Sequence, residues 1–105
     1  MTNVKFFKHK EKKLRRMIEK NPDDPDNYLK LGKLYFLNED YDKSARVYEN
    51  GLKIAPRDKA LLLNCAVARE AMNNLDGAKK LYLEILSIDP NNKPAQERLD
   101  NITSF

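Results

Sequence analysis

The sequence has few of the residues on which most catalytic and metal sites depend. Among 105 residues there is one cysteine, Cys65, and one histidine, His9. A single cysteine excludes an internal disulfide and a zinc site built from cysteines. His9 has no second histidine with which to share a metal, and lysines surround it. We therefore predict no metal, no cofactor and no enzymatic activity.

Glycine and proline are also scarce, with 3 and 5 residues. Gly32, Gly51 and Gly77 are too far apart for a phosphate-binding loop. The scarcity instead favours long helices joined by short turns. No apolar run approaches the roughly 18 residues of a membrane span, and the charged N-terminus has no apolar signal-peptide core. We expect a cytoplasmic protein.

The composition indicates a folded helical chain of one domain, with 41% hydrophobic and 34% charged residues. The charge is uneven. Residues 1–20 contain eight Lys and Arg against two Glu, whereas the whole chain has a net charge of only +4. The basic character therefore belongs to one segment, and the rest of the chain is slightly acidic.

The most informative feature is a repeat of about 34 residues. Pro22, Pro56 and Pro90 follow one another at this interval, and several pairs of other residues do the same. Such a period is typical of stacked helical hairpins. The other matched residues are Asp24, Asp58 and Asn92; Tyr48 and Tyr82; Leu52 and Leu86; Leu31 and Cys65; Gly32 and Ala66; and Ser44 and Ala78.

Each matched position has a physical interpretation. Small residues such as Gly32 and Ser44 let two helices cross closely. Proline ends a helix, and Asp or Asn is a favourable N-cap for the next one. Tyr28, Leu31 and Tyr35 recur at helical spacing and form a buried stripe. The pattern predicts helices near 4–20, 25–38, 41–55, 58–72, 75–88 and 92–103.

This pattern resembles the tetratricopeptide repeat family over Pro25–Asp58 and Lys59–Asn92. The second copy departs from the family at Arg69, where an aromatic is usual, and at Cys65, where leucine is usual. The residues that carry the match in the first copy are Tyr28, Leu31, Gly32, Tyr35, Ser44, Tyr48 and Pro56.

The resemblance implies an all-α fold, a right-handed α–α superhelix (a solenoid) of antiparallel helix pairs. Residues 1–24 would form a basic N-terminal helix that is half a repeat. Residues 25–58 and 59–92 would be the two repeats. Residues 93–105 would form a C-terminal capping helix, in which Ala95, Leu99 and Ile102 make the apolar stripe.

By resemblance, the function is protein–protein interaction, as an adaptor or scaffold. The first helices of successive repeats would line a concave groove that binds a peptide or helix of a partner. Some of the groove residues could instead be core, and Phe6, Phe7 or Phe105 could fill the groove. The predicted groove residues are Leu29, Lys33, Phe36, Leu37, Leu63, Asn64, Val67, Glu70 and Arg98.

Some relatives grip acidic tails of heat-shock chaperones with five Lys, Asn and Arg side chains. Here Asn64 and Arg98 match, and Lys33 is similar in charge. The pattern is broken at Leu29 and Pro94. Three donors could still bind a carboxylate.

The basic N-terminal helix suggests a second class of function. On a helical projection its apolar residues gather on one side and its basic residues on the other. Such a face could bind an acidic partner or an anionic membrane surface. Nucleic acid is less favoured, because no aromatics interleave with the basic residues. The apolar residues are Phe7, Leu14, Met17 and Ile18, and the basic ones are Lys5, Lys8, Lys12, Lys13, Arg15 and Arg16.

Two other interpretations remain open. The same two-sided pattern is what a capping helix needs, with apolar residues inward and charge outward. A stack of only two repeats could also gain neighbours by self-association into a homo-oligomer.

Overall fold

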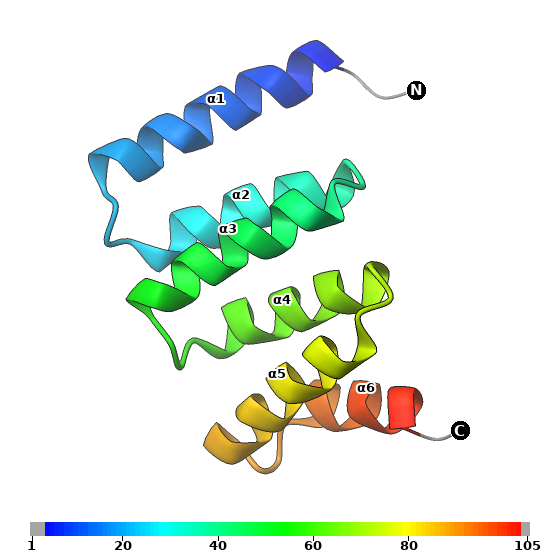
Figure 1. The fold of residues 1–105 in the computed structure, drawn as a ribbon. Helices are drawn as coiled ribbons and strands as arrows, with labels where there is room; N and C mark the ends of the chain where they lie inside the picture. The colour runs from blue at the N-terminus through cyan, green and yellow to red at the C-terminus, as the bar shows by residue number, and fades with distance from the viewer. Residues whose placement is uncertain (1–3, 104–105) are drawn as a thin grey trace.

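The computed structural model describes residues 4–103, and these form six helices and no strand (Figure 1). The helices follow one another down the stack in chain order, and consecutive helices run antiparallel (Figure 1). Every helix end predicted from the sequence lies within one residue of its place in the structure. The helices are α1 (Val4–Lys20), α2 (Pro25–Leu37), α3 (Tyr41–Ile54), α4 (Lys59–Ala71), α5 (Leu75–Ile88) and α6 (Lys93–Thr103).

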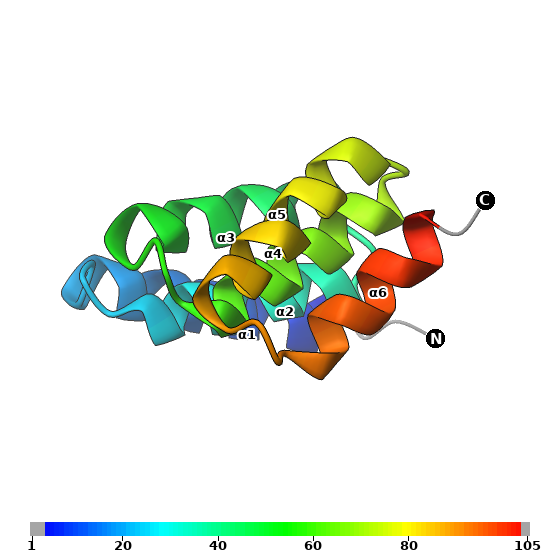
Figure 2. The same cartoon turned by 90° about the horizontal axis from the view of Figure 1, so that it is seen from below.

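The turned view in Figure 2 shows the stack from below, with α5 and α6 in front and α1 behind the other helices. The predicted N-caps begin three of these helices. The Asp24 carboxylate accepts a hydrogen bond from the Asp26 N–H at 3.0 Å at the start of α2. The Asp58 carboxylate accepts one from the Leu61 N–H at 3.1 Å, and Asn92 caps α6 in the same way. Each bond satisfies an N–H group that has no partner within the helix, so the predicted N-caps are confirmed.

The turns inside the two hairpins also repeat. Glu39 and Asn73, 34 residues apart, both have left-handed backbone conformations, with φ of 62° and 60°. The Asp40 N–H donates to the Tyr35 carbonyl at 2.9 Å, and the corresponding bond recurs at the end of α4. These bonds belong to the Schellman motif, which satisfies the last carbonyls of a helix.

Each hairpin closes where small residues meet. Ser44 Oγ donates to the Gly32 carbonyl oxygen at 2.7 Å, and both residues are buried. A Cβ atom added to Gly32 would overlap the Tyr48 ring. Ala66 and Ala78 occupy the same positions in the second hairpin and are fully buried. The predicted close crossings are confirmed.

The core continues through the stack in three adjoining clusters. Leu14 of α1 packs with Leu31 and Tyr35, and Phe7 lies against Tyr35 with the ring centroids 6.0 Å apart. Phe7 therefore belongs to the core and does not fill the groove. The other predicted apolar residues of α1, Met17 and Ile18, pack against the same cluster.

The C-terminal end closes in the same manner. Ala95 and Leu99 of α6 are buried against Tyr82 and Ile85 of α5, and Ile102 packs beside them. The predicted apolar stripe of α6 is confirmed. Phe105, which could have filled the groove, lies outside the described residues.

Arg69, the departure from the family pattern, has an ion-pair partner. Its guanidinium lies 2.6 Å from the Glu49 carboxylate of α3. Arg15 and Tyr35 stand 34 residues before Glu49 and Arg69, and the Arg15 guanidinium donates to the Tyr35 hydroxyl at 2.5 Å. Equivalent positions between neighbouring helices therefore hold a hydrogen bond between α1 and α2, and an ion pair between α3 and α4.

Cys65 is a core residue. Its side chain is 1% exposed and packs with Tyr48 and Leu61. Burial raises the pKa of the thiol from 9.0 to about 11, and the nearby Glu49 carboxylate adds to the effect. The thiol therefore stays protonated and unreactive at neutral pH.

We predict that Gly32→Ala destabilises the protein, although alanine normally stabilises a helix relative to glycine. The added methyl group has no space beside the buried Tyr48 ring. The free energy of unfolding should fall by about 2 kcal/mol or more, measured by urea denaturation followed by circular dichroism. In the double variant with Tyr48→Leu, the Gly32→Ala change should cost less. A stabilising Gly32→Ala would contradict the close crossing.

We also predict that Cys65 lowers stability at alkaline pH. Above pH 9 the unfolded thiol loses its proton, whereas the folded thiol keeps it up to about pH 11. The unfolded state then binds fewer protons, so the free energy of unfolding falls as the pH rises. Between pH 7 and pH 10 this effect should be about 1 kcal/mol. Burial also raises the pKa of Tyr48, to about 12, so some decline should remain in Cys65→Ala. An identical decline in both proteins would refute the prediction.

Candidate functional site

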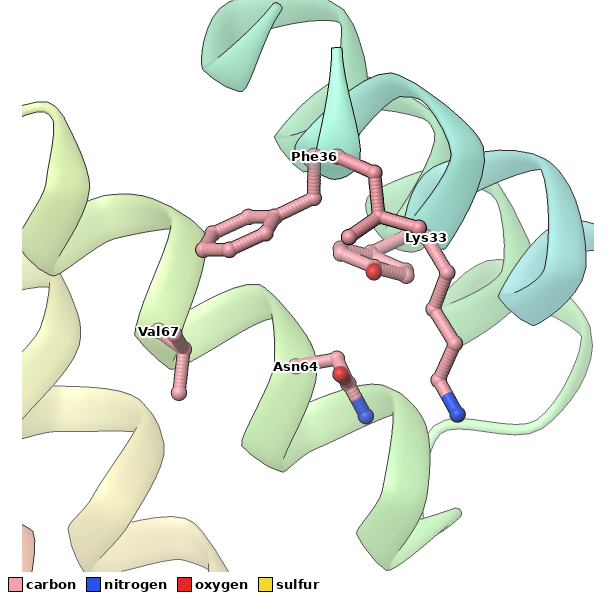
Figure 3. Close-up of a pocket in the computed structure, with 6 residues that line it drawn as sticks. Lys33, Phe36, Asn64 and Val67 are labelled. Atoms are coloured by element: carbon pink, nitrogen blue, oxygen red, sulfur yellow. The ribbon is translucent and has the colours of Figure 1, made fainter. Parts of the chain in front are cut away.

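A hollow of about 240 Å³ opens between α2 and α4, the first helices of the two predicted repeats (Figure 3). Because α2 and α4 contact each other directly, side chains from both helices reach the same space. Five of the nine predicted groove residues line it. These five are Lys33, Phe36, Leu37, Asn64 and Val67, and the sixth lining residue is Tyr48 of α3.

Helical spacing places these side chains together. Lys33, Phe36 and Leu37 stand at positions i, i+3 and i+4 of α2, so they share one face. Asn64 and Val67 are three residues apart on α4 and meet them from the opposite wall. The hollow is thus a direct product of two amphipathic helices one repeat apart.

The hollow has an apolar end and a polar end. The Phe36 ring points toward Val67, whereas the Lys33 amine and the Asn64 amide lie together on the other side (Figure 3). The Phe36 ring packs edge-on against Tyr41, with the ring centroids 5.0 Å apart. The Asn64 amide donates to the Ala60 carbonyl oxygen at 2.8 Å. The Phe36 side chain is therefore held by Tyr41 of α3, in the same hairpin, and the Asn64 side chain is held by its own helix.

Tyr48 was not predicted to line this space. Its position in the 34-residue register indicated only a buried residue, and it is 1% exposed. Its ring lies at the back of the hollow because Gly32, with no side chain, leaves room for it. In the sequence, the glycine at position 32 was the one feature that could have indicated that the Tyr48 ring reaches this space.

Leu29 and Leu63 do not line the hollow. Both are half-buried, and each packs against a core cluster: Leu29 against the one that contains Leu61, and Leu63 against the one that contains Leu62. The alternative that some predicted groove residues are core therefore applies to these two.

Glu70 and Arg98 are engaged with each other. The Arg98 guanidinium lies 3.1 Å from the Glu70 carboxylate, which also accepts a hydrogen bond from the Tyr82 hydroxyl. Together they tie α4 to α5 and α6. A partner carboxylate would have to compete with Glu70 for Arg98. Of the clamp positions, only Lys33 and Asn64 meet in the hollow.

The predicted basic face of α1 is present and has its own hollow of about 310 Å³. Arg15 is not part of it, because its guanidinium bonds to Tyr35 and stacks 5.9 Å from that ring. Lys5 and Lys8 are exposed but also lie outside it. The lining residues are His9, Lys12, Lys13, Arg16, Met17 and Lys20.

Within residues 4–103, no group of three or more His, Cys, Asp or Glu side chains is arranged to hold a metal ion. In the same range, no helix is both long and apolar enough to span a membrane.

Curated relatives share this sequence at moderate identity. A protein named uncharacterized protein ycf37 is 36% identical over 76 residues in Guillardia theta and 35% identical over 75 residues in Pyropia yezoensis. These matches cover 72% and 71% of the chain, and 43% and 42% of the relatives. A chloroplastic tetratricopeptide repeat domain-containing protein, PYG7 of Arabidopsis thaliana, is 33% identical over 104 residues, which cover 95% of the chain and 35% of that protein. The chain thus spans less than half the length of these relatives.

Solved structures share the fold. The first tetratricopeptide repeat domain of Spaghetti (RPAP3), bound to the HSP90 peptide SRMEEVD, superposes with a TM-score of 0.87 at 19% identity. The match covers 93% of this chain and 78% of that one. The solution structure of the first such domain of human RPAP3 gives 0.86, also at 19% identity, with 93% and 77% covered. The all-α helical repeat fold predicted from the sequence is confirmed.

The family model for the tetratricopeptide repeat matches residues 36–99, which is more than half of the chain. The match runs from the end of α2 into α6, and thus includes the α4 wall of the hollow and the whole of the second predicted repeat. Together with the 34-residue period and the stacked hairpins, it shows that the chain belongs to the tetratricopeptide repeat family.

Proposed function

We propose that this domain is a non-catalytic adaptor that docks a peptide or helix of a partner protein in the hollow between α2 and α4. Proteins of this family generally mediate protein–protein interaction, and a structural neighbour has been solved with a bound HSP90 peptide. The observation that carries the proposal is the convergence of Lys33, Phe36, Asn64 and Val67 on one space. The cytoplasmic location predicted from the sequence stays a prediction.

The chemistry of the hollow defines the ligand. An apolar side chain would fit between Phe36 and Val67, and a hydrogen-bond acceptor or carboxylate would meet Lys33 and Asn64 at the other end (Figure 3). Burying one apolar anchor beside one charge-assisted hydrogen bond is a common basis for peptide recognition. Because Leu29 and Pro94 break the clamp and Arg98 pairs with Glu70, we do not propose binding of acidic chaperone tails.

The test is a capture experiment with variants of the hollow. Val67→Asp places a charge at the apolar end, and Lys33→Glu reverses the charge at the polar end. Each should weaken binding of a captured partner at least about tenfold. Leu83→Asp is the matched control, because Leu83 is 49% exposed on α5 and does not line the hollow. Circular dichroism should show unchanged helicity in all three variants.

Other outcomes would favour the alternatives. Capture that survives Val67→Asp but is lost on neutralising Lys12, Lys13 and Arg16 would assign binding to the basic face of α1. Light scattering that shows the molar mass rising with concentration, and a loss of that rise in Val67→Asp, would instead indicate self-association. Either result would refute docking of a separate partner in this hollow.

A further inference from the structure

A third hollow, of about 330 Å³, lies between α1 and α2. It is lined by lysines and leucines alone, without a carboxylate. Leu37 is the most exposed of the leucines, at 82%, whereas Leu14 is buried. The lining residues are Lys10, Leu14, Lys30, Lys33, Leu34 and Leu37.

This hollow is the same place in the repeat as the one between α2 and α4, one period earlier. Its lining residues Leu14, Lys30 and Lys33 stand 34 positions before Tyr48, Asn64 and Val67, which line the later hollow. In the later hollow, α2 supplies the remaining wall. In the earlier one, a helix 34 residues before α2 would have to do so, and none of residues 4–103 takes that place.

The position of α1 in the stack agrees with this register. The helices α2 and α4 each pair with the following helix in a hairpin, whereas α1 packs chiefly on α2 within the described chain. In Figure 1, α1 lies at the end of the stack with no hairpin partner drawn beside it. Its inner side is covered by α2, and the hollow marks where a hairpin partner would lie.

The lining shows which helix would fit. In α3, Ser44 and Tyr48 pack against α2. The residues 34 positions earlier, in α1, are Lys10 and Leu14. The Lys10 amine lies 5.8 Å from the centroid of the Phe6 ring, on the same side of α1. A long charged side chain in place of serine keeps an incoming helix farther away, and a carboxylate on that helix would form a charge-assisted hydrogen bond with it.

The other two lysines of the hollow, Lys30 and Lys33, also favour a negatively charged helix. Lys33 is exposed, and within residues 4–103 it has no ion-pair partner. Lys30 pairs with Asp26 at 3.1 Å, but both side chains are more than half exposed. An exposed pair of this kind contributes little and exchanges readily for another carboxylate.

We propose that the hollow between α1 and α2 binds an acidic amphipathic helix of a partner protein, which completes the half repeat. Its apolar residues would lie on Leu14, Leu34 and Leu37, and its carboxylates would meet the lysines. The place is helical because α2 occupies the equivalent place in the next repeat. This site adjoins the hollow between α2 and α4 and shares Lys33 and Leu37 with it. Its other lining residues are separate from that hollow.

A synthetic peptide derived from α2 tests the proposal. The probe is a capped, fluorescein-labelled peptide with the sequence of residues 25–38, carrying Lys30→Glu and Lys33→Glu. The matched peptide carries Lys30→Gln and Lys33→Gln, so only the charge differs. Fluorescence anisotropy at low salt should show the acidic peptide binding at least about tenfold more tightly. The difference should shrink as salt is added.

Variants of the protein locate the site. Lys10→Glu should weaken binding of the acidic peptide about tenfold or more. Lys79→Glu, an exposed charge reversal on α5, should leave the affinity within about twofold. Val67→Asp should also leave it within about twofold, although the same variant is expected to weaken docking between α2 and α4 at least about tenfold. The two proposals can thus fail separately.

Three results would overturn the inference. Equal affinity for the two peptides would exclude recognition of negative charge. Unchanged affinity in Lys10→Glu would place the peptide elsewhere. Light scattering that shows concentration-dependent dimers, lost in Lys10→Glu, would assign the hollow to a second copy of the chain.

Discussion

The close crossing of the two helices in each hairpin is the constraint on which the rest of the structure depends. At Gly32 and Ser44 the helices approach until a side-chain hydroxyl of one donates to a backbone carbonyl of the other. This approach leaves the Tyr48 ring directly against Gly32, and the same ring lines the hollow between α2 and α4. The hollow between those helices is therefore a consequence of backbone packing as much as of the residues that line it. A wider crossing would allow the Tyr48 ring to move away and would open the back of the hollow.

Around this fixed geometry, the chemistry of equivalent positions varies. The position between successive helices that holds Arg15 and Tyr35 holds Glu49 and Arg69 one repeat later. Arg69 departs from the family pattern, but its charge is paired with the Glu49 carboxylate. The ion pair of Arg69 and Glu49 is partly exposed, so its net contribution to stability is modest. The two pairs occupy equivalent places, one connecting α1 to α2 and the other connecting α3 to α4.

The sequence alone predicted the helices almost completely, because proline, Asp and Asn mark their ends by local chemistry that needs no tertiary partner. It did less well with the site. Helical spacing places Leu29 with Lys33 on one face of α2, and Val67 with Asn64 on one face of α4. It does not show which of these side chains pack against the core. Leu29 packs against a core cluster, whereas Val67 lines the hollow. The engagement of Glu70 depends on Arg98, which is 28 residues away, and no local pattern reveals that ion pair. The left-handed turn at Glu39 was equally hidden, because glutamate is not a residue that this conformation favours.

The two hollows in one register differ in charge. The position of Lys30 in the first becomes Asn64 in the second, and the position of Lys33 becomes Val67. Positive charge is therefore concentrated toward α1 and decreases along the face toward α4. Because Lys33 and Leu37 border both spaces, ligands in the two proposed sites would touch or compete at that border. A single partner long enough to cross both would be oriented by the gradient, with its acidic part over α1 and α2 and its apolar part between Phe36 and Val67. Because the side chains at equivalent positions change from one repeat to the next, they would fix the orientation of such a partner as well as contribute to its affinity.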